Sequence, residues 1–395
     1  MRILVVHNRY QQRGGEDIVV EREVALLRRH GHHVELWTED NARVEAMSRA
    51  RLAAGTIWSR AAHGELGRRV AAGDIEVVHF HNTLPLISPS GYYGARSAGA
   101  AVVQTLHNYR LVCPPGTLLR AGRPCEDCVG RSPWPAVRHR CYRDSAAASA
   151  VVAAMLVAHR AAGTWARAVD AYVALTEFVR DRVLAAGMPR DRVVVKPNFV
   201  EAAPRQAVPE RGAHVLFVGR LSPEKGVATL IEAWRILGTG APRLVIVGDG
   251  PEAAELAARS AGIAGVELLG AQPRERVIEL MADAAALVVP STGYEGFPLV
   301  LVEAFAAGLP VVVSGIGSLA TIVRDGVDGL HAPAGDAVAL AAVVRGLMAD
   351  PELRRRLGHG AYAAWKARFT PEHNHDQLLQ VYAAARARRH GQHGR

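Results

Sequence analysis

The second half of the chain opens at residues 214–226 with the sequence HVLFVGRLSPEKG. Its first five residues are mostly apolar, as in a buried strand, and a loop with glycine and proline follows directly. A longer helical pattern then begins near Gly226, and another short apolar run comes after it. This succession of strand, loop and helix predicts a parallel sheet with crossover helices.

The same succession fills both halves of the chain. Strand candidates lie at residues 3–6, 34–37, 77–80, 101–106, 172–175 and 193–195, and then at 214–218, 244–247, 266–268, 287–289 and 310–313. We therefore expect an α/β protein with two doubly wound, Rossmann-like domains that face each other across a cleft. In such folds ligands bind beyond the carboxyl ends of the strands.

Composition changes mark the expected domain boundaries. The first domain spans residues 1–200 and contains a cysteine-rich insert at 110–145. A segment with two prolines, a glycine and no apolar periodicity follows at 201–213 and is predicted to be a linker. The second domain spans 214–365, and we expect the helical residues 366–390 to pack back on the first domain.

Length and composition narrow the class of protein. A chain of 395 residues with 49% hydrophobic residues excludes a disordered protein or a small disulfide-stapled scaffold. The net charge of +9 favours an anionic partner, such as a phosphorylated ligand, a membrane surface or nucleic acid. No secretory signal is evident, and the longest uncharged apolar run, residues 145–158, is shorter than the roughly 20 residues of a spanning helix. We expect a cytoplasmic protein with peripheral contact to the inner membrane face.

Two basic side chains stand in the loop that follows residues 214–218. The guanidinium of Arg220 can grip phosphate oxygens as a fork, and the ammonium of Lys225 adds a point charge. A solvated turn is the alternative interpretation of these two residues.

A second loop, about seventy residues later, reads EGFPLVLVE from Glu295 to Glu303. If a helix begins at Leu299, the backbone N–H groups around Gly296 and Phe297 lie at its N-terminus and can bind an anion. The carboxylate of Glu303 in an otherwise apolar helix needs donors, and a ribose diol supplies two hydroxyls.

Glycine patterns give a weaker signal for a nucleotide site. Residues 248–253, GDGPEA, formally match a dinucleotide fingerprint, but residues 315–320, GIGSLA, match it as well. A dinucleotide fold normally carries this pattern on its first strand, so the sequence disfavours a nicotinamide or flavin enzyme.

In combination, these motifs resemble the retaining glycosyltransferases of the GT-B fold and, among them, glycosyltransferase family 4. The resemblance covers nearly the whole chain. Its elements are Gly14-Gly15-Glu16, His107, Thr176-Glu177, Pro197-Asn198, the loop with Arg220 and Lys225, residues 248–251, Pro290-Ser291, the pair Glu295 and Glu303, and residues 307–311.

The resemblance implies that the second domain binds a nucleotide-diphosphate sugar and the first domain binds the acceptor. It implies that Arg220 and Lys225 hold the diphosphate, that Glu303 holds the ribose and that Glu295 holds the donor sugar. It further implies donor contacts at Gly14, Gly15, Gly248, Gly270, Gly296, Phe297, Pro298 and Leu299, and a place for His107 at the reacting centre.

The expected mechanism follows from charge. Cleavage of the sugar–phosphate bond leaves negative charge on the departing diphosphate, which the cations of Arg220 and Lys225 would stabilise. These two residues could replace a divalent ion, so we expect no catalytic metal. The resemblance favours front-face displacement, in which the departing phosphate takes the proton of the acceptor hydroxyl. His107 is followed by Asn108, where relatives often have aspartate, and a purely structural role for His107 stays open.

All four cysteines lie in one segment, at Cys113, Cys125, Cys128 and Cys141. Their C-x11-C-x2-C-x12-C spacing fits a structural zinc site. An iron–sulfur cluster has the same ligands, and disulfides or free thiols are further alternatives, although a reducing cytoplasm disfavours disulfides. The segment is basic and aromatic and begins six residues after His107, so we expect it to shape the acceptor site; alternatively, it only caps the domain.

Two other function classes fit parts of the sequence. A sugar-nucleotide epimerase shares the architecture but does not usually carry Arg220, Lys225, Glu295 and Glu303 together. A nucleic-acid-binding protein would use the cysteine segment and the arginine-rich tail, but the chain lacks lysine-rich clusters and repeated aromatic-basic spacing. We expect a glycan or lipid-linked acceptor, in the synthesis of cell-surface polysaccharide or glycolipid.

Overall fold

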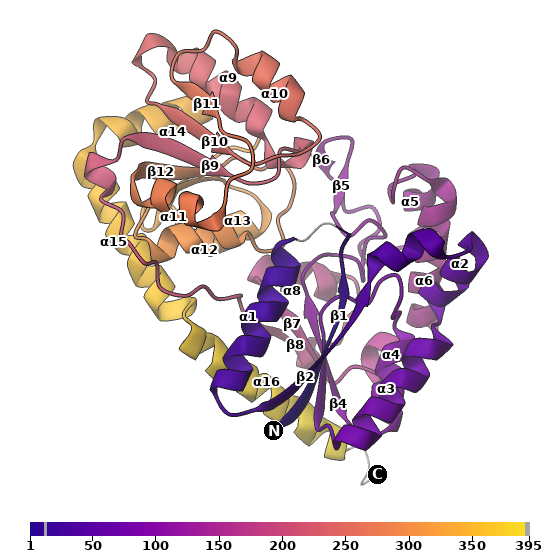
Figure 1. The fold of residues 1–395 in the computed structure, drawn as a ribbon. Helices are drawn as coiled ribbons and strands as arrows, with labels where there is room; N and C mark the ends of the chain where they lie inside the picture. Colours follow the sequence, from indigo (N-terminus) through magenta and orange to yellow (C-terminus); the bar gives the residue numbers. More distant parts are fainter. Residues whose placement is uncertain (12–13, 392–395) are drawn as a thin grey trace. The chain divides into compact units, whose positions relative to one another are not determined.

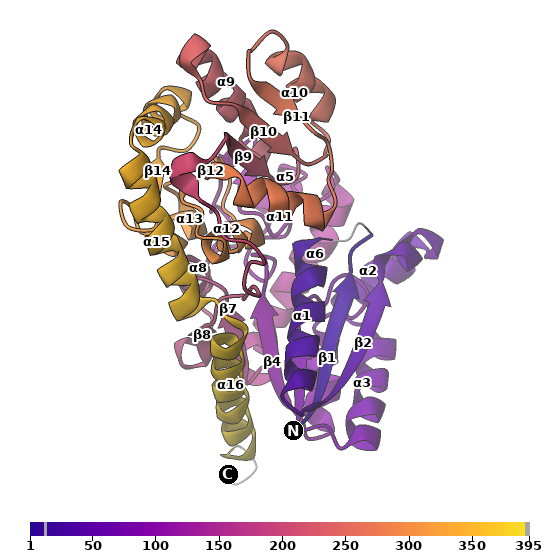
Figure 2. The ribbon, with the colours of Figure 1, turned by 60° about the vertical axis from the view of Figure 1, so that its left-hand side comes forward.

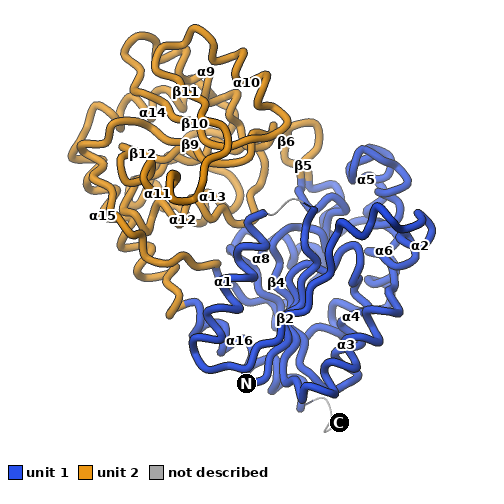
Figure 3. Tube along the Cα trace, in the orientation of Figure 1, with its two compact units in different colours: residues 1–118, 126–197, 374–395 blue, residues 119–125, 198–373 orange. Residues whose placement is uncertain are grey.

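The computed structural model describes residues 1–11 and 14–391 and divides into two compact units (Figures 1 and 3). Unit 1 comprises Met1–Leu118, Glu126–Pro197 and Asn374–Arg395. Unit 2 comprises Leu119–Cys125 and Asn198–His373, and therefore includes the segment 201–213 and a short piece of the cysteine-rich segment.

Unit 1 is built on a six-stranded parallel sheet in the order β2-β1-β3-β4-β7-β8. The strands are β1 (Arg2–Arg9), β2 (His33–Asp40), β3 (Val77–Phe80), β4 (Ala101–Leu106), β7 (Ala171–Ala174) and β8 (Val193–Val195). The chain moves from β1 outward to β2 and then returns past β1 to β3, so strand order reverses there. This reversal confirms the predicted doubly wound fold of the first half.

Helices cover both faces of this sheet. They are α1 (Gly15–Arg29), α2 (Arg49–Ile57), α3 (Arg60–Gly73), α4 (Ser90–Ser97), α6 (Ala146–Ala161), α7 (Thr164–Arg167), α8 (Glu177–Ala185) and the last helix, α16 (Pro371–Gly391). Figure 1 shows α1 and α16 on one face and α3 and α4 on the other, and Figure 2 shows the same for α1, α16 and α3. Because both faces are covered, residues 3–6 of β1 are fully buried, which explains their continuous apolar sequence.

Unit 2 contains a second six-stranded parallel sheet, in the order β11-β10-β9-β12-β13-β14. The strands are β9 (His214–Val218), β10 (Leu244–Val247), β11 (Val266–Leu268), β12 (Ala284–Val289), β13 (Val311–Ser314) and β14 (Gly329–Ala332). Strand order reverses between β9 and β12, so this unit is doubly wound as well. The sequence does not predict β14, because its four residues, GLHA, include no β-branched side chain.

The helices of unit 2 are α9 (Val227–Leu237), α10 (Ala253–Ser260), α11 (Arg274–Ala282), α12 (Leu299–Ala306), α13 (Gly317–Ile322), α14 (Ala337–Ala349) and α15 (Pro351–Arg368). Alternate strand residues enter two separate cores: Leu216 packs in one cluster, and Val215 and Phe217 pack in the other. Since neighbouring strand residues point to opposite faces, the sheet is buried on both sides.

The cysteine-rich segment has little regular structure. It contains the antiparallel hairpin of β5 (Leu119–Arg120) and β6 (Arg123–Pro124) and the single-turn helix α5 (Pro135–Arg138).

No helix in the described part of the chain combines the length and the apolar composition that crossing a membrane requires.

Candidate functional site

The donor residues predicted for unit 2 lie on loops at the carboxyl ends of its strands. Arg220 and Lys225 follow β9, Gly248 follows β10, and Glu295 follows β12. Because all these strands are parallel and β9 lies between β10 and β12, the three loops meet at one edge of the sheet. The sheet order therefore brings together residues that are far apart in the sequence.

Lys225 and Glu295 form a close ion pair across this edge. The ammonium Nζ of Lys225 lies 2.7 Å from Oε1 and 2.8 Å from Oε2 of the Glu295 carboxylate. The hydroxyl of Ser291 also donates to Oε1, at 2.6 Å. Both charged side chains are largely shielded, with exposed fractions of 26% for Lys225 and 13% for Glu295. The sequence names both residues but does not predict that they pair.

Arg220 has a different environment. Its side chain is exposed, and no carboxylate of the described residues forms an ion pair with its guanidinium. A guanidinium with no acidic partner in a loop beside Lys225 is suited to an anionic ligand.

Close packing explains the glycines of the neighbouring loop. A Cβ atom on Gly248, whose φ is +146°, would lie 1.8 Å from the carbonyl oxygen of Gly219, and one on Gly250 would lie 2.3 Å from that of Leu221. The N–H of Gly248 donates to the carbonyl of Gly270 at 2.9 Å. The GDGP sequence is thus accounted for by the approach of the Arg220 loop, without a dinucleotide.

Glu303 lies in α12, which begins at Leu299 as predicted. Pro298 is the N-cap residue of the helix and makes no side-chain cap hydrogen bond. Oε1 of Glu303 accepts a hydrogen bond from Nη1 of Arg274 at 2.9 Å. Glu303 and Arg274 both line a cavity of about 420 Å³ within unit 2. The sequence does not single out Arg274, because its partner is 29 residues away on another helix.

The predicted residues of unit 1 are Gly14, Gly15 and His107. Gly14 precedes α1 in an extended conformation, and its N–H donates to Oδ2 of Asp17 at 2.8 Å. Oδ1 of the same carboxylate lies 2.9 Å from Nε2 of the buried His7 in β1. Burial would raise the pKa of Asp17, but the hydrogen bonds from His7 and Gly14 lower it. An ionised Asp17 therefore secures the glycine-rich start of α1.

His107 follows β4 and contacts a second histidine. Its Nε2 lies 2.8 Å from Nδ1 of His81, which follows β3, and the two rings stack. On its other side, Nε2 of His81 lies 3.2 Å from the carboxylate of Glu23 in α1. Glu23 therefore contacts His81, which in turn contacts His107.

Glu23 belongs to a buried polar cluster that the sequence alone does not predict. Its Oε1 lies 3.0 Å from Nδ1 of His79, and its Oε2 lies 3.3 Å from the ammonium of Lys196. Helix α16 completes the cluster: Tyr382 lies 2.8 Å from His79, and Asn374 lies 3.1 Å from Lys196. The last helix therefore supplies polar partners to the centre of unit 1.

Burial determines the charges of these groups. It lowers the pKa of His81 to about 4 and holds the pKa of His107 well below its usual value, with the neighbouring histidines acting in the same direction. Burial opposes ionisation of Glu23, but His79 and Lys196 hold its pKa well below the usual value. At neutral pH, His81 and His107 are neutral and Glu23 is ionised. A proton on Nε2 of His81 then faces Glu23, and Nδ1 of His81 accepts the hydrogen bond from His107.

A metal site requires several ligand atoms close to one another. Among the described residues, Glu23, His79 and His81 are the one group of three or more potential ligands whose atoms come within 4.8 Å of one another. The ammonium of Lys196 already balances this carboxylate, which disfavours a cation there. Cys113, Cys128 and Cys141 of unit 1 form no such group among the described residues, and no disulfide joins the cysteines there. Structural zinc stays a prediction, which metal analysis of the purified protein would test.

Comparisons with known proteins give the family. Residues 13–204 match the model described as Glycosyltransferase Family 4, and residues 199–364 match that of Glycosyl transferases group 1. The chain is 33% identical over 333 residues to D-inositol 3-phosphate glycosyltransferase 1 of Catenulispora acidiphila, covering 80% of this chain and 73% of that protein. It is 37% identical over 204 residues to an exopolysaccharide phosphotransferase of Streptomyces coelicolor, but this match covers 50% of this chain and only 21% of that protein.

Solved structures support the same fold. Anabaena HepE in complex with UDP superposes with a TM-score of 0.68 at 18% identity, over 97% of this chain and 100% of that one. The two family models adjoin each other along the chain, and one relative matches most of both sequences. The chain belongs to the GT-B glycosyltransferases of family 4.

Proposed function

We propose that the protein transfers a sugar from a nucleoside diphosphate sugar to an acceptor hydroxyl, with retention of the anomeric configuration. The observation that carries this proposal is the meeting of the Arg220 and Lys225 loop with Glu295 at one edge of the unit 2 sheet. The UDP complex of the structural relative supports a nucleotide donor.

The two cations would act on the departing diphosphate. Arg220 can take phosphate oxygens in its exposed fork, and Lys225 is held in place by Glu295 and so needs little reorganisation. Fixed positive charges of this kind stabilise the negative charge that develops as the sugar–phosphate bond breaks. Glu295, beside Lys225, would accept hydrogen bonds from hydroxyls of the donor sugar.

The nucleoside would bind in the cavity beside Glu303. This cavity is large enough for a small ligand, and the Glu303 carboxylate can accept hydrogen bonds from both ribose hydroxyls. Arg274 would hold that carboxylate in position. Gly270, whose carbonyl already accepts the N–H of Gly248, would border the nucleobase.

His107 would serve as a neutral hydrogen-bonding group in unit 1. Its partner is His81, backed by Glu23, so this pair takes the orienting role that a following aspartate would have in relatives. With its Nε2 proton committed to His81, Nδ1 of His107 can accept a hydrogen bond from a sugar hydroxyl. The departing phosphate, rather than His107, would take the acceptor proton.

For the acceptor, we propose a glycan or lipid-linked glycan in the synthesis of cell-surface polysaccharide or glycolipid, at the inner membrane face. The names of relatives support this class: one is an exopolysaccharide phosphotransferase, and another, of Mycobacterium leprae, is a phosphatidyl-myo-inositol mannosyltransferase. The net charge of +9 suits an anionic membrane.

The test is incubation of the purified protein with UDP-, GDP- and ADP-sugars and candidate acceptors. Sugar transfer predicts release of one nucleoside diphosphate and an α-linked product from an α-linked donor, read from the anomeric NMR signals. Conversion of the sugar nucleotide without any glycosylated acceptor would favour the epimerase instead. Salt-sensitive binding of nucleic acid, with no turnover of any sugar nucleotide, would favour the nucleic-acid-binding alternative.

A further inference from the structure

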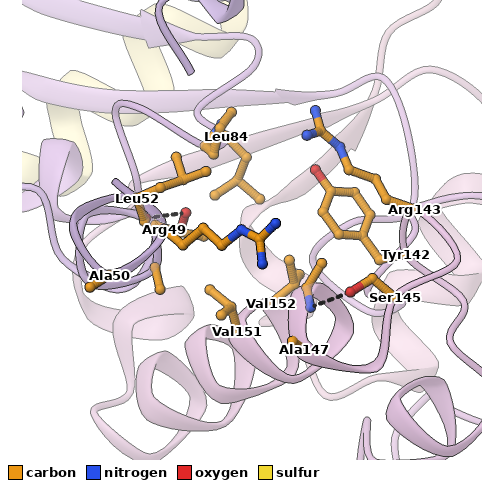
Figure 4. Close-up of a pocket in the computed structure, with 14 residues that line it drawn as sticks. Arg49, Ala50, Leu52, Leu84, Tyr142, Arg143, Ser145, Ala147, Val151 and Val152 are labelled. Carbon is orange, nitrogen blue, oxygen red and sulfur yellow. Dashed lines mark hydrogen bonds between the residues drawn. The ribbon is translucent and has the colours of Figure 1, made fainter. Parts of the chain in front are cut away.

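Unit 1 contains a cavity of its own, distinct from the one beside Glu303 in unit 2. It has a volume of about 590 Å³ and lies between α2 and α6 (Figure 4). Its walls are mostly apolar and include Leu52, Leu84, Val151 and Val152. The volume falls within the range of small-molecule sites, about 300–1,000 Å³. The walls are suited to a hydrocarbon chain rather than to a polar ligand.

Cationic groups border this apolar space. Figure 4 shows the guanidinium of Arg49 extending into the cavity between Leu84 and Val152. Arg143 stands near the opposite wall, beside Tyr142. Both arginines are exposed, and neither forms an ion pair with a carboxylate in residues 1–11 or 14–391.

Two further features add positive potential at the same place. The guanidiniums of Arg110 and Arg143 lie 5.4 and 5.6 Å from the centre of the Tyr142 ring. Helices α2 and α6 both begin at the cavity, since Arg49 is the first residue of α2 and Ser145 is the N-cap of α6. The positive end of each helix dipole therefore faces the cationic border.

We propose that this cavity binds a lipid phosphate, with the hydrocarbon chain inside and the phosphate paired with Arg49 and Arg143. A neutral lipid would leave both guanidiniums without a partner, and a small anion would leave the apolar walls unfilled. A phosphate on a hydrocarbon chain satisfies both, because a guanidinium fork matches phosphate oxygens and the walls match methylene groups.

The position of the cavity connects it with the proposed reaction. Leu84 lines this cavity and also a small recess that contains His81 and His107. A lipid held between α2 and α6 would therefore place its headgroup on the side of unit 1 that carries His107. The inference rests on the proposed transfer to a lipid-linked acceptor and names the site that holds the lipid.

The direct test is calorimetric titration of the full chain, without donor, with alkyl phosphates below their critical micelle concentrations. From octyl to dodecyl phosphate, the affinity should rise about fourfold per methylene until the cavity is full. Dodecyl phosphate should bind at least about tenfold more tightly than uncharged dodecyl maltoside, and inorganic phosphate alone should bind far more weakly. Equal binding of the charged and uncharged amphiphiles would overturn the proposal.

Variants of the two arginines test where dodecyl phosphate binds. Arg49→Gln and Arg143→Gln should each weaken dodecyl phosphate about tenfold, because each removes a charge-assisted hydrogen bond. Arg51→Gln is the matched control: Arg51 lies on the same helix but does not line this cavity, so its loss should change affinity less than about twofold. If Arg49→Gln and Arg51→Gln weaken the affinity for dodecyl phosphate equally, the effect comes from general surface charge, and the proposed site is contradicted.

A variant with a filled cavity distinguishes binding of the hydrocarbon chain from attraction to a membrane. Val151→Phe should abolish the chain-length dependence while leaving the weak binding of inorganic phosphate unchanged. Sedimentation with anionic phosphatidylglycerol vesicles measures attraction to a membrane surface. The proposal fails if the arginine variants weaken this sedimentation while Val151→Phe changes neither vesicle binding nor alkyl phosphate binding. The two arginines would then bind only a membrane surface. Lipid binding is measured without donor, so Lys225→Ala should bind dodecyl phosphate like the wild type. Loss of sugar transfer and loss of lipid binding can therefore be told apart.

Discussion

At the residue scale, the state of His107 depends on groups that lie far from it in the sequence. His81 is its hydrogen-bonding partner, and Glu23 lies on the far side of His81. Burial keeps both histidines neutral, so their protonation opposes the native state. The buried histidines are therefore an acid-sensitive element in unit 1.

The stability of the protein should decrease as the pH falls from about 6.5 to 4. In this window the unfolded chain takes up a proton at His81, whereas the native pKa of His81 is lowered to about 4. The stability present above pH 6.5 is lost as the pH approaches the native pKa, by an amount on the order of 3 kcal/mol for this group. Urea denaturation across this range measures it.

His81→Gln should flatten this pH dependence. The exposed His139 provides the control, because His139→Gln removes a histidine without removing a buried one. A slope between pH 6.5 and 4 that is the same in His81→Gln as in the wild type would show that His81 does not remain neutral in the native protein.

At the element scale, Glu23 and Lys196 connect three elements of unit 1. Glu23 lies in α1, Lys196 directly follows β8, and Asn374 and Tyr382 belong to α16. Lys196 is 1% exposed and Glu23 is 2% exposed, so each depends on the other for compensation of its charge.

Glu23→Gln should therefore destabilise the protein by about 3–5 kcal/mol, because it leaves a buried ammonium without its counter-charge. The double variant Glu23→Gln/Lys196→Met should recover much of this loss, since it removes both charges. Glu21→Gln, at an exposed position of the same helix, should change the free energy of unfolding by less than about 0.5 kcal/mol. A double variant no more stable than Glu23→Gln would indicate that the two charges do not compensate each other.

The donor loops of unit 2 are held by a close backbone approach. Gly226 has a φ of +69°, and a Cβ atom there would lie 2.0 Å from the carbonyl oxygen of Pro290, which directly follows β12. Gly226→Ala should destabilise the protein by more than about 1 kcal/mol and weaken donor binding, because Lys225 precedes this position.

Gly240→Ala is the matched control for the glycine. Nothing lies within 4 Å of a Cβ atom at Gly240, so the free energy of unfolding should stay the same or rise slightly. If thermal denaturation shows Gly226→Ala to be as stable as Gly240→Ala, the approach of the two loops is not as tight as described.

At the scale of the whole molecule, hydrophobic patterning predicts most of the architecture. The apolar runs mark every strand of the two doubly wound sheets except the edge strand β14, which forms by pairing with β13. Patterning reports burial along one segment, and it predicts a strand only where the segment itself is apolar or β-branched. A short edge strand such as Gly329–Ala332 depends on its neighbour instead.

The candidate site could be predicted only in part. Arg220, Lys225, Glu295 and Glu303 stand out because they are charged residues in motifs that resemble a known family. The sequence does not predict which side chains form pairs, because sheet order and helix placement determine which distant residues meet. The pairs it misses are Lys225–Glu295, Arg274–Glu303 and Glu23–Lys196. Helix α16 is the clearest case, since Tyr382 reaches His79 across 303 residues of sequence.

We propose above that the loop after β9 binds the diphosphate of a nucleotide sugar. Calorimetric titration of the full chain with UDP, GDP and ADP tests it most directly, in the wild type, in Arg220→Ala and in Lys225→Ala, with Arg235→Ala as a control at an exposed arginine of α9. One nucleotide should bind the wild type and the control with equal affinity, and each of the two loop variants should weaken it at least about tenfold. Unchanged affinity in both Arg220→Ala and Lys225→Ala would contradict the proposed donor site.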